Sequence, residues 1–85
     1  MSAAATAFAW SRATRRPRDK LVLLAVAEGY IEGKRRYPVD DLAAICETKH
    51  HHLFRSLLDL QSEGHIRWHI AESSEKLVSV EILLG

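Results

Sequence analysis

Residues 38–66, PVDDLAAICETKHHHLFRSLLDLQSEGHI, decide the fold that this chain is expected to adopt. The segment LAAICE carries apolar residues at helical spacing, and either of the two aspartates before it can cap a helix N-terminus. Another helix is expected over residues 49–62, with Thr48 as its cap and Gly64 as the left-handed residue that ends it. It is the third helix of the predicted domain, because one more helix is expected before Pro38. The stretch therefore predicts two short helices joined by a tight turn.

Two segments after this stretch place apolar side chains at every second position, which is the pattern of a strand with one buried face. They are residues 65–70 and residues 77–84, and the polar sequence AESSEK connects them. Two such strands around a short polar loop predict a β-hairpin. The side chains expected to face the core are Ile66, Trp68, Ile70, Val78, Val80, Ile82 and Leu84.

The residues before Pro38 add a helix and a short strand. Pro17 suits the first turn of a helix, and the sequence from Leu21 to Ala27 is apolar on nearly every face, so this helix is expected to be central and buried. Gly33 ends it, and Pro38 limits KRRYPV to a short strand or an extended link. The side chains expected to be largely buried include Leu24, Leu42, Leu57, Leu60 and Trp68. The predicted fold is α+β, in the order helix, strand, helix, helix, strand, strand.

The chain is expected to form one domain with a basic extension. Its 85 residues, 47% of them hydrophobic, suffice for a single small core. The first 20 residues hold five basic side chains and one acid, although the net charge of the whole chain is only +1. We therefore expect residues 1–17 to form a flexible basic arm and residues 18–85 the folded domain. Phe8 and Trp10 are costly to leave in water and can dock on the core.

Several classes of site are not expected. Cys46 is the only cysteine, so no internal disulfide can form, and its predicted position in the core makes the thiol inert. The sequence has no glycine-rich phosphate loop and no paired carboxylates in an apolar setting. Adjacent helical residues point about 100° apart, so the histidines at positions 50–52 cannot converge on one metal ion. We expect no enzyme activity, cofactor, metal or small-molecule substrate.

The expected compartment is the cytoplasm. No apolar run reaches the roughly 20 residues that a membrane-spanning helix needs, and the N-terminus lacks the features of a secretory signal. Residues 1–18 contain no acid, which is a feature of organelle transit peptides, but short basic arms are also common on nucleic-acid-binding domains.

Four short motifs carry a resemblance to a known family. Lys20 precedes LVLLAVA, Pro38-Val39 precedes the second helix, Leu42-Ala43 opens that helix, and a Leu-x-x-x-Gly-x-Ile pattern closes the third helix at Leu60–Ile66. With these motifs, residues 18–70 resemble the winged helix-turn-helix domains of phage and bacterial replication proteins and transcriptional regulators. The resemblance implies a three-helix core with a C-terminal β-hairpin wing, and double-stranded DNA as the partner of the third helix.

The turn before the third helix departs from the family pattern. Glu47 stands where glycine is usual, Thr48-Lys49 where serine or threonine opens the helix, and His52-Leu53 where a Thr-Val pair is usual. A glutamate in this turn has to adopt the dihedral angles of the missing glycine at some energetic cost. These changes affect the polar surface more than the fold.

Basic residues in four places are the expected DNA contacts, with a solvated polar surface as the alternative for each. They are Lys49, His50, His51 and Arg55 on the third helix, Arg67 beside the wing, Arg15 and Arg16 in the arm, and Arg35 and Arg36 before the short strand. The histidines expected to be exposed are His50, His51, His65 and His69.

A protein-interaction role is the alternative to DNA binding. Phe54 and Leu58 lie one turn apart on the third helix, away from its core stripe. They either pack under the wing or against the arm, or form an apolar patch for another protein or a second copy. Glu72 and Glu75 make the wing tip acidic, which disfavours its insertion into DNA. On this interpretation the chain is a winged-helix interaction module, a subunit or an inhibitor of a larger nucleoprotein complex. For either function, a homodimer or a larger nucleoprotein complex is the expected assembly.

Overall fold

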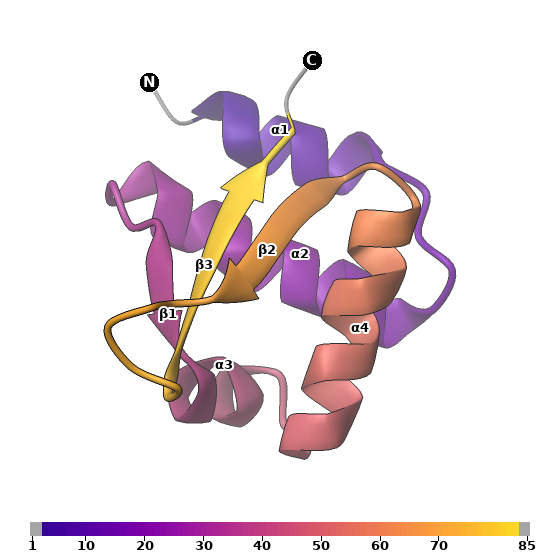
Figure 1. The fold of residues 1–85 in the computed structure, drawn as a ribbon. Coiled ribbons are helices and arrows are strands. Elements are labelled where there is room, and N and C mark those ends of the chain that lie inside the picture. The colour runs from indigo at the N-terminus through magenta and orange to yellow at the C-terminus, as the bar shows by residue number, and fades with distance from the viewer. Residues whose placement is uncertain (1–2, 84–85) are drawn as a thin grey trace.

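The computed structural model describes residues 3–83, and the side chains from residue 7 onward (Figure 1). Within this part of the chain the elements are α1 (Ala3–Ser11), α2 (Pro17–Ile31), β1 (Arg36–Pro38), α3 (Val39–Ile45), α4 (His50–Ser62), β2 (Ile66–Ile70) and β3 (Leu77–Ile82). The strands form one antiparallel sheet in the order β1-β3-β2. The fold is therefore α+β, and its elements from α2 onward follow the predicted order.

The N-terminal segment differs from the flexible arm expected over residues 1–17. Its residues 3–11 form α1, which packs against α2, and both Phe8 and Ala9 are buried in the core. The Lys20 ammonium group donates to the carbonyl oxygens of Ala9, Trp10 and Arg12, and so satisfies the free carbonyls at the end of α1. The alanine-rich sequence has a high helix propensity but no polar-apolar stripe, so its periodicity did not reveal a helix.

Three residues with positive φ shape the connections between elements. Gly33 (φ +85°) follows α2 and Gly64 (φ +81°) follows α4, as predicted. Glu47, in the turn between α3 and α4, has φ +50°, so this glutamate does adopt the left-handed conformation that glycine usually supplies.

The predicted helix caps are wrong. Pro38 is the N-cap of α3 and Lys49 is the N-cap of α4, and neither helix start has a side-chain cap hydrogen bond. The aspartates expected to cap α3, Asp40 and Asp41, lie inside its first turn, where they still favour the positive end of the helix dipole. Thr48 lies one residue before the cap of α4.

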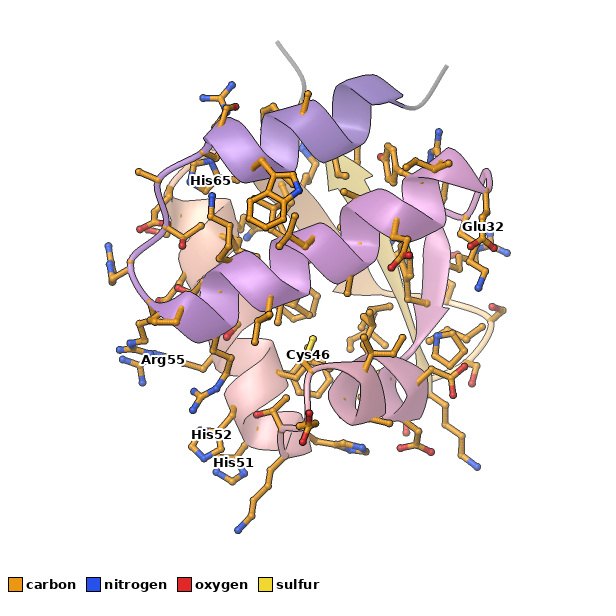
Figure 2. The ribbon with its side chains drawn as sticks, turned by 180° about the vertical axis from the view of Figure 1, so that it is seen from behind. Glu32, Cys46, His51, His52, Arg55 and His65 are labelled. Carbon is orange, nitrogen blue, oxygen red and sulfur yellow. The ribbon has the colours of Figure 1, made fainter. Side chains whose placement is uncertain are left out.

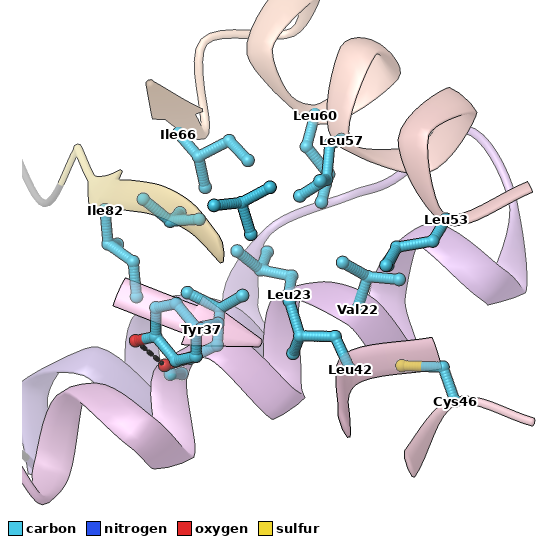
Figure 3. Packing of buried hydrophobic residues seen from close by; sticks show 14 of the residues in the cluster. Val22, Leu23, Tyr37, Leu42, Cys46, Leu53, Leu57, Leu60, Ile66 and Ile82 are labelled. Carbon is cyan, nitrogen blue, oxygen red and sulfur yellow. Dashed lines mark hydrogen bonds between the residues drawn. The ribbon is translucent and has the colours of Figure 1, made fainter. Parts of the chain in front are cut away.

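The core lies between α2, α4 and the sheet (Figure 3). Leu53, Leu57 and Leu60 of α4 are fully buried against Val22 and Leu23 of α2 in one hydrophobic cluster. This confirms the core stripe read from the spacing of the α4 leucines. Leu42 is also buried as predicted, whereas Leu24 and Trp68 are only partly buried.

The hairpin of β2 and β3 is confirmed, and Val78, Val80 and Ile82 face the core. Ile70, at the end of the edge strand β2, is 41% exposed, although its register partner Val78 on the central strand β3 is fully buried. Leu84, the last residue of the predicted stripe, lies outside the described residues. None of the helices between residues 3 and 83 is both long and apolar enough to cross a membrane.

Candidate nucleic-acid interface

The exposed face of α4 follows from the burial of its leucines. Because Leu53, Leu57 and Leu60 point into the core, the opposite positions His51, Arg55 and Leu58 point outward at spacings of four and three residues. Leu58 has 53% of its surface exposed. The outward face of this helix is therefore basic and partly apolar.

A groove of about 690 Å³ runs along this face, between α4 and the start of α2. Figure 2 shows three of its side chains, His51, His52 and Arg55, on the same side of the molecule. The lining residues are Arg16, Arg18, His51, His52, Phe54, Arg55 and Leu58. Every ionisable side chain among them is basic, so the groove is suited to an anionic ligand.

One apolar side chain of the groove, Phe54, packs against the sheet. The rings of Phe54 and Trp68 lie 5.7 Å apart, so Phe54 packs against β2 and is only partly exposed. Phe54 and Leu58 were expected either to pack under the wing or against the arm, or to form an exposed apolar patch. Phe54 packs under the wing, whereas Leu58 remains on the surface.

The electrostatics at the α4 N-terminus favour negative charge. The rings of His51 and His52 lie 4.1 Å apart. Partial burial lowers the pKa of His52, and the positive charges of His51, Arg18 and Lys49 lower it further. A bound anion would reverse the electrostatic part of this effect.

The carboxylate of Asp59 forms ion pairs with three arginines, further along α4 from its N-terminus. Asp59, only 6% exposed, lies with its Oδ1 atom 3.6 Å from Nη1 of Arg15 and 3.8 Å from Nε of Arg55. Its Oδ2 atom lies 3.4 Å from Nη1 of Arg16. Arg15 also lies 3.6 Å from Glu63. Asp59 therefore connects the segment before α2 to α4 through its ion pairs with Arg15 and Arg16, whereas its ion pair with Arg55 lies within α4.

A second carboxylate is buried beneath this network. Asp19, in the first turn of α2, is fully buried, and neither of its oxygens has a hydrogen bond of ordinary geometry within the described part of the chain. Burial raises the pKa of Asp19, and the charge of Asp59 adds to this increase, whereas Ser56 and Arg16 oppose it. Burial therefore disfavours the charged form of this carboxylate.

Other predicted contacts lie away from the groove. His50 is paired with Asp40 of α3, with 2.8 Å between Nε2 and Oδ1. Arg67 lies 3.4 Å from Glu81 on the exposed face of the sheet. The guanidinium of Arg35 stacks over the Tyr30 ring at 3.6 Å.

The remaining sheet residues form a separate polar surface. Arg36 and His69 both pair with Ser79 in the strand register, from the two sides of β3. They line a depression of about 430 Å³ together with Glu72 of the β2–β3 loop. The nine residues predicted to contact DNA therefore do not form one surface, because some lie on the α4 side of the molecule and the others lie on or beside the sheet.

The exposure expected for His65 is wrong. Its side chain is buried, its Nε2 atom lies 2.9 Å from the carbonyl oxygen of Ala13, and its ring contacts Phe8 edge-on. The cause is α1 and the segment after it, which cover this side of the molecule.

Two groove residues were missed by the sequence analysis. Arg18 faces the groove only because α2 packs across α4, which no local pattern reveals. His52 was considered as a metal ligand and as a departure from the family pattern, but not as a DNA contact, although a helical projection places it about 100° from His51, at the rim of the exposed face. Among the described residues, no cluster of three His, Cys, Asp or Glu side chains is arranged to hold a metal ion.

Comparison of the chain with protein-family models, with curated proteins and with solved structures gives no match.

Proposed function

We propose that this protein is a winged helix-turn-helix DNA-binding protein, a transcriptional regulator or an accessory factor of replication or recombination. The observation that carries the proposal is the acid-free basic groove along the exposed face of α4. The element order from α2 to β3 and the β1-β3-β2 sheet support the assignment of α3 and α4 to the helix-turn-helix and of β2 and β3 to the wing.

In this proposal α4 enters the major groove of DNA, which is about 12 Å wide and admits a helix. Arg55 and His51 point outward from its first two turns and supply donors for base edges. Lys49 and Arg18 lie beside them and supply phosphate contacts. The free N–H groups at the start of α4 add positive potential at the same place.

The other basic residues have secondary roles. Arg15 and Arg16 reach phosphates from positions that Asp59 holds, so part of their charge is already compensated. The wing tip carries Glu72 and Glu75, which disfavours its insertion into the minor groove. The α4 side is therefore the proposed DNA-facing side.

The test is fluorescence anisotropy with a labelled random-sequence duplex at increasing salt. Binding should weaken linearly on a log–log plot, because each neutralised phosphate releases counterions. The double variant Lys49→Ala/Arg55→Ala should bind at least about tenfold more weakly, because each lost contact costs about 1 kcal/mol or more. Arg35→Ala/Arg67→Ala removes the same charge from the sheet side and should lose much less. Equal losses, or no salt-dependent binding, would refute the proposal.

The exposed side chain of Leu58 favours a second candidate function, a winged-helix module that binds another protein through α4. Leu58→Ser separates the two. DNA binding through basic residues should change little, whereas an apolar protein contact should lose most of its affinity. The size of the free protein at rising concentration, measured by sedimentation equilibrium, would show whether that protein is a second copy.

A further inference from the structure

A second concave surface lies between α2 and α3. It is a pocket of about 120 Å³ whose lining includes Ala25, Glu28 and Glu32 of α2 and Asp41, Leu42 and Ile45 of α3. Figure 2 shows Glu32, at the rim of this pocket, away from His51, His52 and Arg55. The pocket and the α4 groove have no lining residue in common, so they are separate surfaces.

The pocket has exposed apolar side chains at its mouth. Ile45 is 66% exposed at the end of α3. Leu21 is 53% exposed and lies one helical turn before Ala25, so it extends the same stripe of α2. Covering these side chains would remove apolar surface from water, which is the main driving force of association.

The wall of the pocket is fixed by Tyr37. Its hydroxyl donates to the carbonyl oxygen of Val26 at 2.9 Å and lies 3.1 Å from that of Lys34. The ring lies so close to Gly29 that a Cβ atom there would be 2.4 Å from Cε2 of the tyrosine. This wall is preformed, so a ligand would not have to order it.

The rim of the pocket is acidic. Glu28, Glu32 and Asp41 contribute three carboxylates, and Lys34 is the single basic side chain in the lining. None of the ion pairs formed between described residues involves these three acids. Their charge is free to meet that of a partner, and complementary charge favours association and selects the partner.

We propose that this α2–α3 pocket docks a basic amphipathic helix of a protein partner. An apolar side chain of that helix packs on Ile45 and Leu42, and flanking lysine or arginine residues meet Glu28, Glu32 and Asp41. The inference does not depend on DNA binding, because the pocket and the α4 groove have no lining residue in common.

The test uses a synthetic 14-residue helical peptide with leucine on one face and lysine on the other, labelled for fluorescence anisotropy. A peptide with glutamate in place of lysine is the charge control. The lysine peptide should bind at least about tenfold more tightly, and Glu28→Gln/Glu32→Gln/Asp41→Asn should remove most of this advantage. Glu72→Gln/Glu75→Gln/Glu81→Gln changes the net charge equally and should keep the advantage.

A second pair of variants tests the apolar contact. Ile45→Ser should weaken binding of the lysine peptide about tenfold, whereas Ile70→Ser, at an exposed isoleucine of β2, should change it less than twofold. Equal effects of the matched variants, or peptide-induced NMR shifts on residues other than those of α2 and α3, would overturn the proposal. Self-association of the free protein that Ile45→Ser abolishes would also overturn it, because the occupant would then be a second copy.

Discussion

The α4 groove and the α2–α3 pocket have the same construction but opposite charge. Each combines exposed aliphatic side chains with ionisable ones, which are all basic in the groove and mostly acidic around the pocket. Their charges nearly cancel, so the net charge of +1 hides a strongly polarised molecule. The comparison shows that a near-neutral net charge says little about which partners a small domain attracts.

The two surfaces also differ in how their charges are held. Asp59 ties Arg15, Arg16 and Arg55 together beside the groove. The three acids of the pocket rim have no such partner among the described residues. A ligand of the groove therefore competes with an internal carboxylate, whereas a ligand of the pocket does not.

The largest expected effect comes from a substitution in the hydrophobic core between α2 and α4, because α2 contributes to both surfaces. Leu57→Ala should lower the free energy of unfolding by about 2–5 kcal/mol, because it leaves a cavity in the core between α2 and α4. Chemical denaturation followed by circular dichroism measures this change. Leu58→Ala, one residue later on the exposed face, should change stability by less than about 0.5 kcal/mol. Similar losses for both variants would mean that α4 does not pack as described.

The second largest effect is expected from a substitution in the wall of the α2–α3 pocket. Gly29→Ala should cost about 1–3 kcal/mol of stability, because the new methyl group would overlap the hydrogen-bonded Tyr37 ring. Thermal unfolding compared with Glu28→Ala, a neighbouring exposed position, isolates the steric effect. A stable Gly29→Ala protein would show that Tyr37 can move and that the pocket wall is not preformed.

A smaller effect tests the internal competition in the groove. Asp59→Asn should free Arg16 and Arg55 for phosphates, while Arg15 keeps its ion pair with Glu63, and should strengthen binding to a random-sequence duplex by about 0.5–1 kcal/mol. The dependence on salt should also become steeper. Glu81→Gln removes one negative charge beside Arg67 and is the matched control. If both variants strengthen binding equally, only net charge matters and Asp59 has no special role.

The smallest effect is a pH dependence of DNA binding. In the free protein, partial burial and the neighbouring positive charges lower the pKa of His52, which favours its neutral imidazole. Phosphates near it would favour the charged form, so the complex would bind more protons than the free protein. Affinity should therefore rise as the pH falls, on the order of two- to fivefold per groove histidine between about pH 8 and 6.

Anisotropy at constant salt measures this pH profile. His51→Gln/His52→Gln should flatten it, and His69→Gln, on the sheet, should not. A flat profile for the unsubstituted protein would place the histidines outside the DNA interface.

The sequence predicted those features that depend on local patterns. The spacing of Leu53, Leu57 and Leu60 identified the buried face of α4, and Gly64 identified its end. Once the buried face of α4 was identified, the opposite positions Arg55 and His51 could be predicted to be exposed.

Features that depend on distant residues were not predicted. Arg15 and Asp59 are far apart in the sequence, so their ion pair arises only when the segment before α2 lies against α4. His65 was expected to be exposed because its neighbours alternate, but α1 covers it. The pocket acids lie on two helices, and neither helix alone indicates that they share a rim.

The strand order has a consequence for how the chain folds. β3 is the last described strand along the chain, yet it lies between β1 and β2. β1 therefore has no strand to pair with until β3 arrives across most of the intervening sequence, and closing such a distant contact is slow. During synthesis the helices can form as they leave the ribosome, but the sheet has to wait for β3. A nascent chain that stalls before Leu77 would leave the backbone edges of β1 and β2 without their strand partner, and it would be the form of this protein most open to aggregation and proteolysis.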